Sequence, residues 1–159
     1  MTAALSYAQD YDEFLCVPYP LPFAPFLWWN GGLGDGVFAP YVRNSGIFVC
    51  PSRAQLALSY GISVHDMGYY YGSYEAKSLG QITNPANTIY LGDNDTWRPI
   101  NTLYSENQYL YGAGTYGANY FMMSMRHNGG GNYAFVDGHA KWLSQQAVSG
   151  DPNFTKYNQ

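Results

Sequence analysis

The sequence predicts an α+β fold in which an N-terminal helix packs on a mostly antiparallel β-sheet that ends in a C-terminal β-hairpin. Three observations support this prediction. Residues 1–14 contain helix-forming Ala and Leu with no helix breaker. Short apolar runs bounded by Gly and Pro follow in the middle of the chain, as expected for strands. Two β-prone runs near the end flank an Asp-Gly pair. A length of 159 residues predicts a single domain, 1–159.

The first predicted element is the helix over residues 1–14. Leu5, Ala8, Asp12 and Leu15 repeat at helical spacing, and Pro18 ends the pattern. Residues 17–40 are rich in Pro and Gly and include Trp28 and Trp29. This composition excludes long regular elements and predicts an irregular aromatic segment.

The middle of the chain predicts short strands and one further helix. Residues 47–49 form a compact apolar strand candidate, and a helix is expected from Pro51, with Ser52 as its N-cap and Gly61 as its stop. Strands are expected within residues 67–74 and at residues 88–91. Residues 94–107 are polar and rich in turn formers, which predicts a loop.

The hairpin is the most specific local prediction. Residues 132–136 and 139–143 are β-prone and flank Asp137-Gly138. Asp-Gly favours a two-residue turn in which both residues have positive φ. We therefore expect Asp137 and Gly138 to form a tight turn between the last two strands.

Composition excludes some partners and favours others. Eleven acidic residues against seven Lys and Arg give a net charge of -4, so nucleic acid is not an expected partner. Charged residues make up only 11% of the chain, and 17 residues are Tyr. Such a surface suits contact with copies of itself or with attached glycans. The apolar runs are far shorter than the roughly 20 residues of a membrane helix, so no membrane span is expected.

Two cysteines predict a disulfide. Cys16 and Cys50 form no Cys-x-x-Cys pair and have no neighbouring His. A bridge between them would stabilise the fold by roughly 3 to 4 kcal/mol and would indicate an oxidising, extracellular location. Two buried free thiols are the alternative. The sequons at Asn94 and Asn153 make these residues candidates for glycosylation in such a compartment.

The sequence contains few candidate residues for metal binding or catalysis. His127, Asp137 and His139 are of types that can hold a transition metal, but structural use is favoured, with the His127 ring folding back onto Asp137 or a carbonyl. Asp93 and Asp95 offer oxygen ligands compatible with calcium, but they lack the full ligand series of an EF-hand, so an Asx turn is favoured. The chain has no hydrolase motif, so we expect no enzyme activity and no cofactor other than this possible calcium.

Three segments resemble bacterial type IV pilin-like proteins. They are residues 7–13 (YAQDYDE), residues 40–52 (PYVRNSGIFVCPS) and residues 126–139 (RHNGGGNYAFVDGH). The last is similar to the prepilin-type group named for its H-x9-DG motif, here His127, nine residues, then Asp137 and Gly138. Together the segments span most of the chain, in the order that this group shows.

The resemblance implies an exported pilin-like head that assembles into pili or pseudopili. Precursors of this type begin with a basic leader, a Gly-Phe processing site and an apolar anchor helix, none of which precedes residues 1–14. We therefore expect residues 1–14 to be the remnant of the long N-terminal helix. In this interpretation His127, Asp137, Gly138 and His139 record a structural turn.

Two functional hypotheses follow. The first is a non-enzymatic, extracellular structural subunit that assembles with copies of itself into a pilus-like or pseudopilus-like filament. The alternative is a soluble extracellular pilin-like module that binds glycans or proteins through exposed aromatic residues. The candidate contact residues are Trp28, Trp29, Tyr69, Tyr70 and Tyr71. A metal-dependent enzyme at His127, Asp137 and His139 is the weakest possibility.

Overall fold

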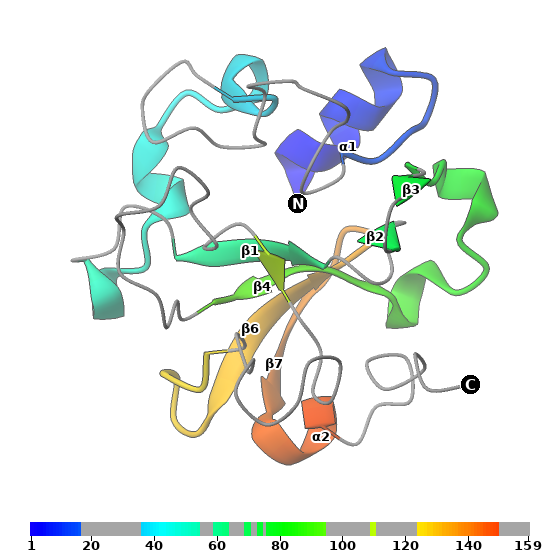
Figure 1. Ribbon diagram of the computed structural model, residues 1–159. Coiled ribbons are helices and arrows are strands. Elements are labelled where there is room, and N and C mark those ends of the chain that lie inside the picture. The colour runs from blue at the N-terminus through cyan, green and yellow to red at the C-terminus, as the bar shows by residue number, and fades with distance from the viewer. Residues whose placement is uncertain are drawn as a thin grey trace.

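The computed structural model has an α+β architecture. It describes residues 1–16, 36–54, 59–63, 69–70, 73–74, 76–94, 109–110 and 124–149. Helix α1 (Thr2–Asp10) lies on one side of the central sheet, and the short helix α2 (Gln145–Ser149) lies on the other side, directly after the last strand (Figure 1). The predicted fold class and the N-terminal helix are therefore confirmed.

The central sheet has five strands in the order β5-β1-β4-β6-β7. Their bounds are β1 Tyr60–Ser63, β4 Ile89–Asp93, β5 Tyr109–Leu110, β6 Gly130–Phe135 and β7 Ala140–Ser144. β1, β4, β6 and β7 are antiparallel neighbours, and β5 is parallel to β1. A separate hairpin pairs β2 (Tyr69–Tyr70) with β3 (Ser73–Tyr74). The strands expected at 88–91 and within 67–74 are confirmed.

Helix α1 ends earlier than predicted. Asp12 and Glu13 have positive φ of 51° and 63°, which reverses the chain after Asp10. The Glu13 N–H donates to the Ala8 carbonyl at 2.8 Å, a hydrogen bond typical of a Schellman cap. Asp tolerates the left-handed conformation better than most residues. The reversal brings Leu15 back into the core beside Ala4 and Ala8.

Two apolar clusters form the core. The larger one contains Ala4, Ala8, Ile62 and Tyr90 on the α1 side, and the smaller one contains Ile89, Tyr133, Phe135 and Val148. Tyr90 is fully buried, and its hydroxyl donates to the Cys16 carbonyl at 2.7 Å. Tyr90 and Tyr133 are thus core residues, whereas Tyr11 is 53% exposed.

Short 3-10 helices occupy residues 45–48 and 51–53, where a strand and the start of a helix are expected. Residues 55–58 of the expected helix lie outside the described residues. Residues Ser45–Phe48 form one such turn, because the Asn44 side chain accepts from the Gly46 N–H at 2.9 Å and caps it. The strand expected at 47–49 is therefore wrong. A second turn, Pro51–Arg53, has Cys50 rather than Ser52 as its N-cap, and Gly61 lies inside β1 instead of ending a helix. Further 3-10 turns are Ala39–Tyr41, Leu79–Gln81 and Pro85–Asn87.

The C-terminal hairpin is confirmed, but its turn differs from the prediction. The Gly138 N–H donates to the Phe135 carbonyl and the Phe135 N–H donates to the His139 carbonyl, both at 2.9 Å. This pattern encloses residues 136–138 in a three-residue loop. Of Asp137 and Gly138, only Gly138 has positive φ, at 100°. A three-residue loop needs one left-handed residue at its end, so the two-residue turn with two positive φ angles is wrong.

Candidate functional site

A buried carboxylate lies at the centre of the polar part of the fold. Asp93, the last residue of β4, is fully buried. Its Oδ1 accepts from Arg126 Nη2 at 2.6 Å, and its Oδ2 accepts from Asn132 N at 2.6 Å and Asn132 Nδ2 at 3.1 Å. Both oxygens are therefore fixed by donors from the segment that leads into and forms β6.

Arg126 connects three segments of the chain. Besides Asp93, its guanidinium donates to the Asn94 carbonyl at 3.0 Å and to the Ser59 carbonyl at 2.6 Å. Its side chain is 8% exposed. The residue thus joins the end of β4 to the residue that precedes β1. Composition and local spacing predict none of these contacts, because each partner lies at least 32 residues away.

A tight turn positions His127 next to Asp93. Asn128 and Gly129 have positive φ of 55° and 75°, and His127 and Gly130 form a bridge on either side of them. Positive φ at both central residues is characteristic of a type I′ turn, which Asn-Gly favours. The Trp142 Nε1 donates to the His127 carbonyl at 2.7 Å and holds this turn against β7. Asn128-Gly129 is the sequence signal from which this turn was predictable.

One ring nitrogen of His127, Nε2, faces both the Cys50 thiol and the Asp93 carboxylate. Nε2 lies 3.4 Å from Cys50 Sγ and 3.4 Å from Asp93 Oδ2. The ligand atoms of Cys50, Asp93 and His127 all lie within 4.8 Å of one another, the only such group among the residues that the structure describes. A nucleophilic triad uses the two ring nitrogens for two different partners. The arrangement is instead a convergence of three donor atoms on one point.

The structure contradicts the predicted disulfide between Cys16 and Cys50. Cys16 and Cys50 are both free and buried, so the expected disulfide is wrong and the free-thiol alternative holds. Cys16 lies in the apolar cluster beside Ala8 and Tyr90, whereas Cys50 lies beside His127. Burial raises the pKa of the Cys16 thiol from 9.0 to about 12. The two thiols therefore occupy different environments.

Asp137 and His139 form their own contact at the hairpin turn. Asp137 Oδ1 accepts from the His139 N–H at 3.2 Å and pairs with His139 Nδ1 at 2.6 Å. Desolvation raises the pKa of Asp137, but the hydrogen bonds from His139 together outweigh it and hold the pKa below 3.8. The expected contact of His127 with Asp137 is wrong, because His127 faces Cys50 and Asp93. His127, Asp137 and His139 thus do not form a metal triad.

Of the remaining predicted site residues, some are described by the structure and the others lie outside the described residues. Asn94 is 2% exposed, which leaves no room for a glycan on its side chain. Asp93 is held by Arg126 and Asn132 as given above. Trp28, Trp29, Tyr71, Asp95 and Asn153 lie outside the described residues, and only the backbone is described for Tyr69 and Tyr70. The calcium and aromatic-contact predictions at these positions stay predictions.

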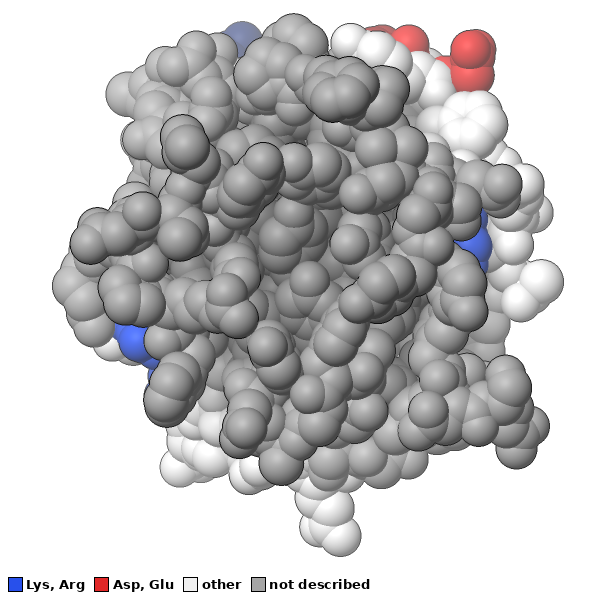
Figure 2. Space-filling view, in the orientation of Figure 1, with Lys and Arg blue, Asp and Glu red and all other residues white. Residues whose placement is uncertain are grey.

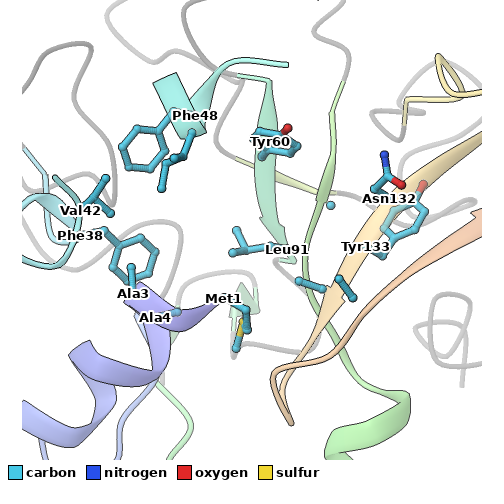
Figure 3. A pocket seen from close by; sticks show the side chains of 14 residues that line it. Met1, Ala3, Ala4, Phe38, Val42, Phe48, Tyr60, Leu91, Asn132 and Tyr133 are labelled. Carbon is cyan, nitrogen blue, oxygen red and sulfur yellow. The ribbon is translucent and has the colours of Figure 1, made fainter. Parts of the chain in front are cut away.

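An apolar groove opens between the start of α1, the 3-10 turns and the sheet (Figure 3). Its volume is about 250 Å³, and its lining is mostly apolar, including Met1, Ala4, Phe38, Phe48, Leu91 and Ala140. In Figure 2 the charged side chains of the described residues lie near the rim of the face in view. The sequence does not predict this groove, because its walls come from segments far apart in the chain.

No family model, curated protein or solved structure matches this chain. Among the helices that the structure describes, none has the length and apolarity needed to cross a lipid bilayer.

Proposed function

We propose that this chain is a non-enzymatic, pilin-like structural subunit that assembles with copies of itself into an extracellular filament. The extracellular location rests on the motif resemblance alone, because the cysteines are free thiols. The low content of charged residues, 11%, supports self-assembly by keeping repulsion between copies small.

One observation carries the proposal: an apolar groove and an exposed aromatic pair lie at opposite ends of α1. The groove begins at Met1, and Tyr11 and Phe14 follow the C-terminal end of the helix. Tyr11 is 53% exposed and Phe14 is 41% exposed. We call Tyr11 and Phe14 the aromatic knob. A nine-residue helix separates groove and knob by about 14 Å.

The proposed contact places the aromatic knob of one copy in the apolar groove of the next. Groove and knob are different surfaces, so the contact is heterologous. A heterologous contact that does not close into a ring produces an open fibre. Burial of exposed aromatic area supplies the driving force, at roughly 25 cal/mol per Å².

Sedimentation velocity over increasing concentration tests this contact. Ala140→Glu places a charge at an exposed position of the groove, and Phe14→Glu places one on the knob. Each variant alone is expected to stay monomeric, whereas an equimolar mixture is expected to stop at dimers, because one intact groove meets one intact knob. Ala147→Glu, the same substitution at an exposed position of α2, is the matched control and should assemble like the wild type. Unchanged assembly of both groove and knob variants would contradict the proposal.

A further inference from the structure

The point on which Cys50, Asp93 and His127 converge has the composition of a transition-metal site. Cys50 offers a sulfur, His127 a nitrogen and Asp93 an oxygen. Zinc binds these three types of ligand, and a thiolate excludes the hard cations Mg²⁺ and Ca²⁺ as preferred occupants. Both cysteines are free, so the Cys50 sulfur is available as a ligand.

Two of the three distances between the donor atoms already match a tetrahedral metal site. Bonds of about 2.3 Å to sulfur and about 2.0 to 2.2 Å to nitrogen and oxygen place ligand atoms about 3.3 to 3.6 Å apart at tetrahedral angles. His127 Nε2 lies 3.4 Å from both Cys50 Sγ and Asp93 Oδ2. Two edges of the tetrahedron are therefore already formed, and the third is at most 4.8 Å.

The surroundings orient the ligands as in known metal sites. Arg126 holds Asp93 Oδ1 and Asn132 holds Oδ2, so the carboxylate cannot rotate away from His127. Ligating carboxylates in metal sites are themselves hydrogen-bonded in this way. The Asn128-Gly129 turn fixes the backbone of His127, and the Cys50 N–H donates to Ser59 Oγ at 2.9 Å.

We propose that Cys50, Asp93 and His127 bind one divalent transition-metal ion of the zinc class. On binding, the Cys50 thiol loses its proton to solvent and the longer hydrogen bond from Asn132 Nδ2 to Asp93 Oδ2, 3.1 Å, breaks. The metal then bonds to Sγ, Oδ2 and Nε2. Cys50 is 2% exposed and Asp93 is fully buried, whereas the His127 side chain is 26% exposed. The open fourth position therefore faces the His127 side, where water completes the coordination. The site is internal to one chain and so does not depend on self-assembly.

Titration of the reduced, metal-free chain with Co²⁺ tests the proposal. Cobalt bound to a thiolate gives a near-ultraviolet charge-transfer band, which we expect to saturate at one equivalent and to disappear when Zn²⁺ is added. Cys50→Ser should abolish the band. His127→Gln should lower the affinity for cobalt by more than about 100-fold, because removing a residue that only orients a ligand typically lowers metal affinity by about 10- to 100-fold. Cys16→Ala removes the other buried thiol and should bind cobalt like the wild type. No saturable band in the wild type, or an equal loss in Cys16→Ala, would overturn the proposal.

X-ray absorption at the zinc edge keeps the test independent of variant folding. The wild-type chain loaded with one equivalent of Zn²⁺ should show one sulfur neighbour at about 2.3 Å, with nitrogen and oxygen neighbours at about 2.0 to 2.2 Å. A shell of nitrogen and oxygen alone would mean an adventitious ion only and would refute the site.

Discussion

Arg126 Nη2 lies 2.6 Å from Asp93 Oδ1, and the two side chains are only 8% and 0% exposed. A buried ion pair stabilises little relative to apolar residues, but removing one partner leaves a buried charge without compensation. Because Arg126 also donates to the Ser59 and Asn94 carbonyls, this pair ties β4 to the start of β1. It is the polar centre of the fold.

We expect Arg126→Met to lower the free energy of unfolding by about 3 to 5 kcal/mol, since Asp93 then loses its positive partner in a buried position. Urea denaturation followed by circular dichroism measures the change. Asp137→Asn alters a carboxylate that pairs with His139 at the surface and is the control. Its effect should be small by comparison, and equal effects of the two variants would contradict the assigned role of Arg126.

Gly138→Ala should destabilise the chain by about 1 kcal/mol. The φ of Gly138 is 100°, which residues with a Cβ rarely adopt, and the added Cβ would lie 3.3 Å from Leu5 Cδ1. Gly80→Ala is the matched control, because its φ is not positive and no atom lies within 4 Å of the added Cβ. Thermal unfolding of both variants measures the difference, and a Gly80→Ala loss as large as that of Gly138→Ala would be inconsistent with this turn geometry.

Both cysteines should react with an alkylating reagent when the chain is unfolded without reductant. The structure holds Cys16 and Cys50 as free thiols, so mass spectrometry is expected to show two alkylated residues. In the folded chain Cys16 should react slowly, because it is 3% exposed and burial raises its pKa to about 12. A peptide that links Cys16 to Cys50 would restore the disulfide prediction and refute the free-thiol structure.

Stability should fall as the pH rises above about 9. The pKa of Cys16 is raised from 9.0 to about 12 in the folded chain, so the unfolded chain releases this proton first. The stabilisation is complete below pH 9.0 and is lost between the two pKa values, by about 1.4 kcal/mol per pH unit. Urea denaturation at about pH 8 and about pH 10 measures this loss.

Cys16→Ala is the control for the alkaline effect. It lowers stability at every pH, but it removes the decline that begins near pH 9.0. The tyrosines extend the decline to higher pH, since burial raises the pKa of Tyr7 to about 12 and that of Tyr90 well above 10.0. An unchanged pH dependence in Cys16→Ala would assign the effect to other groups.

The sequence predicted those parts of the fold that depend on local patterns. Helix-forming residues located α1, and Asp137-Gly138 located the final hairpin. The turn type was missed, because a single left-handed glycine at Gly138 satisfies a three-residue loop as well. The prediction of a strand at 47–49 is wrong, because the Asn44 side chain stabilises a competing 3-10 turn.

The candidate site was not predictable in the same way. Cys50 and His127 are 77 residues apart, and Asp93 and Arg126 are 33 residues apart, so no local spacing joins them. The sequence points to His127, but with Asp137 as its expected partner, which is wrong. It also points to Asp93, as a calcium ligand with Asp95, and Asp95 lies outside the described residues. The Asn128-Gly129 pair was a usable signal for the turn that positions His127. The pairing of β4 with β1 and β6 brings Asp93, Arg126 and His127 together, and the hydrogen bond from the Cys50 N–H to Ser59 Oγ adds Cys50.

Electron microscopy of the purified full-length native protein at high concentration tests the central claim most directly. We expect filaments in the wild type and in Ala147→Glu, and separate single particles in Ala140→Glu. Strictly monomeric wild-type particles at high concentration would contradict the claim that this chain is built to assemble with itself.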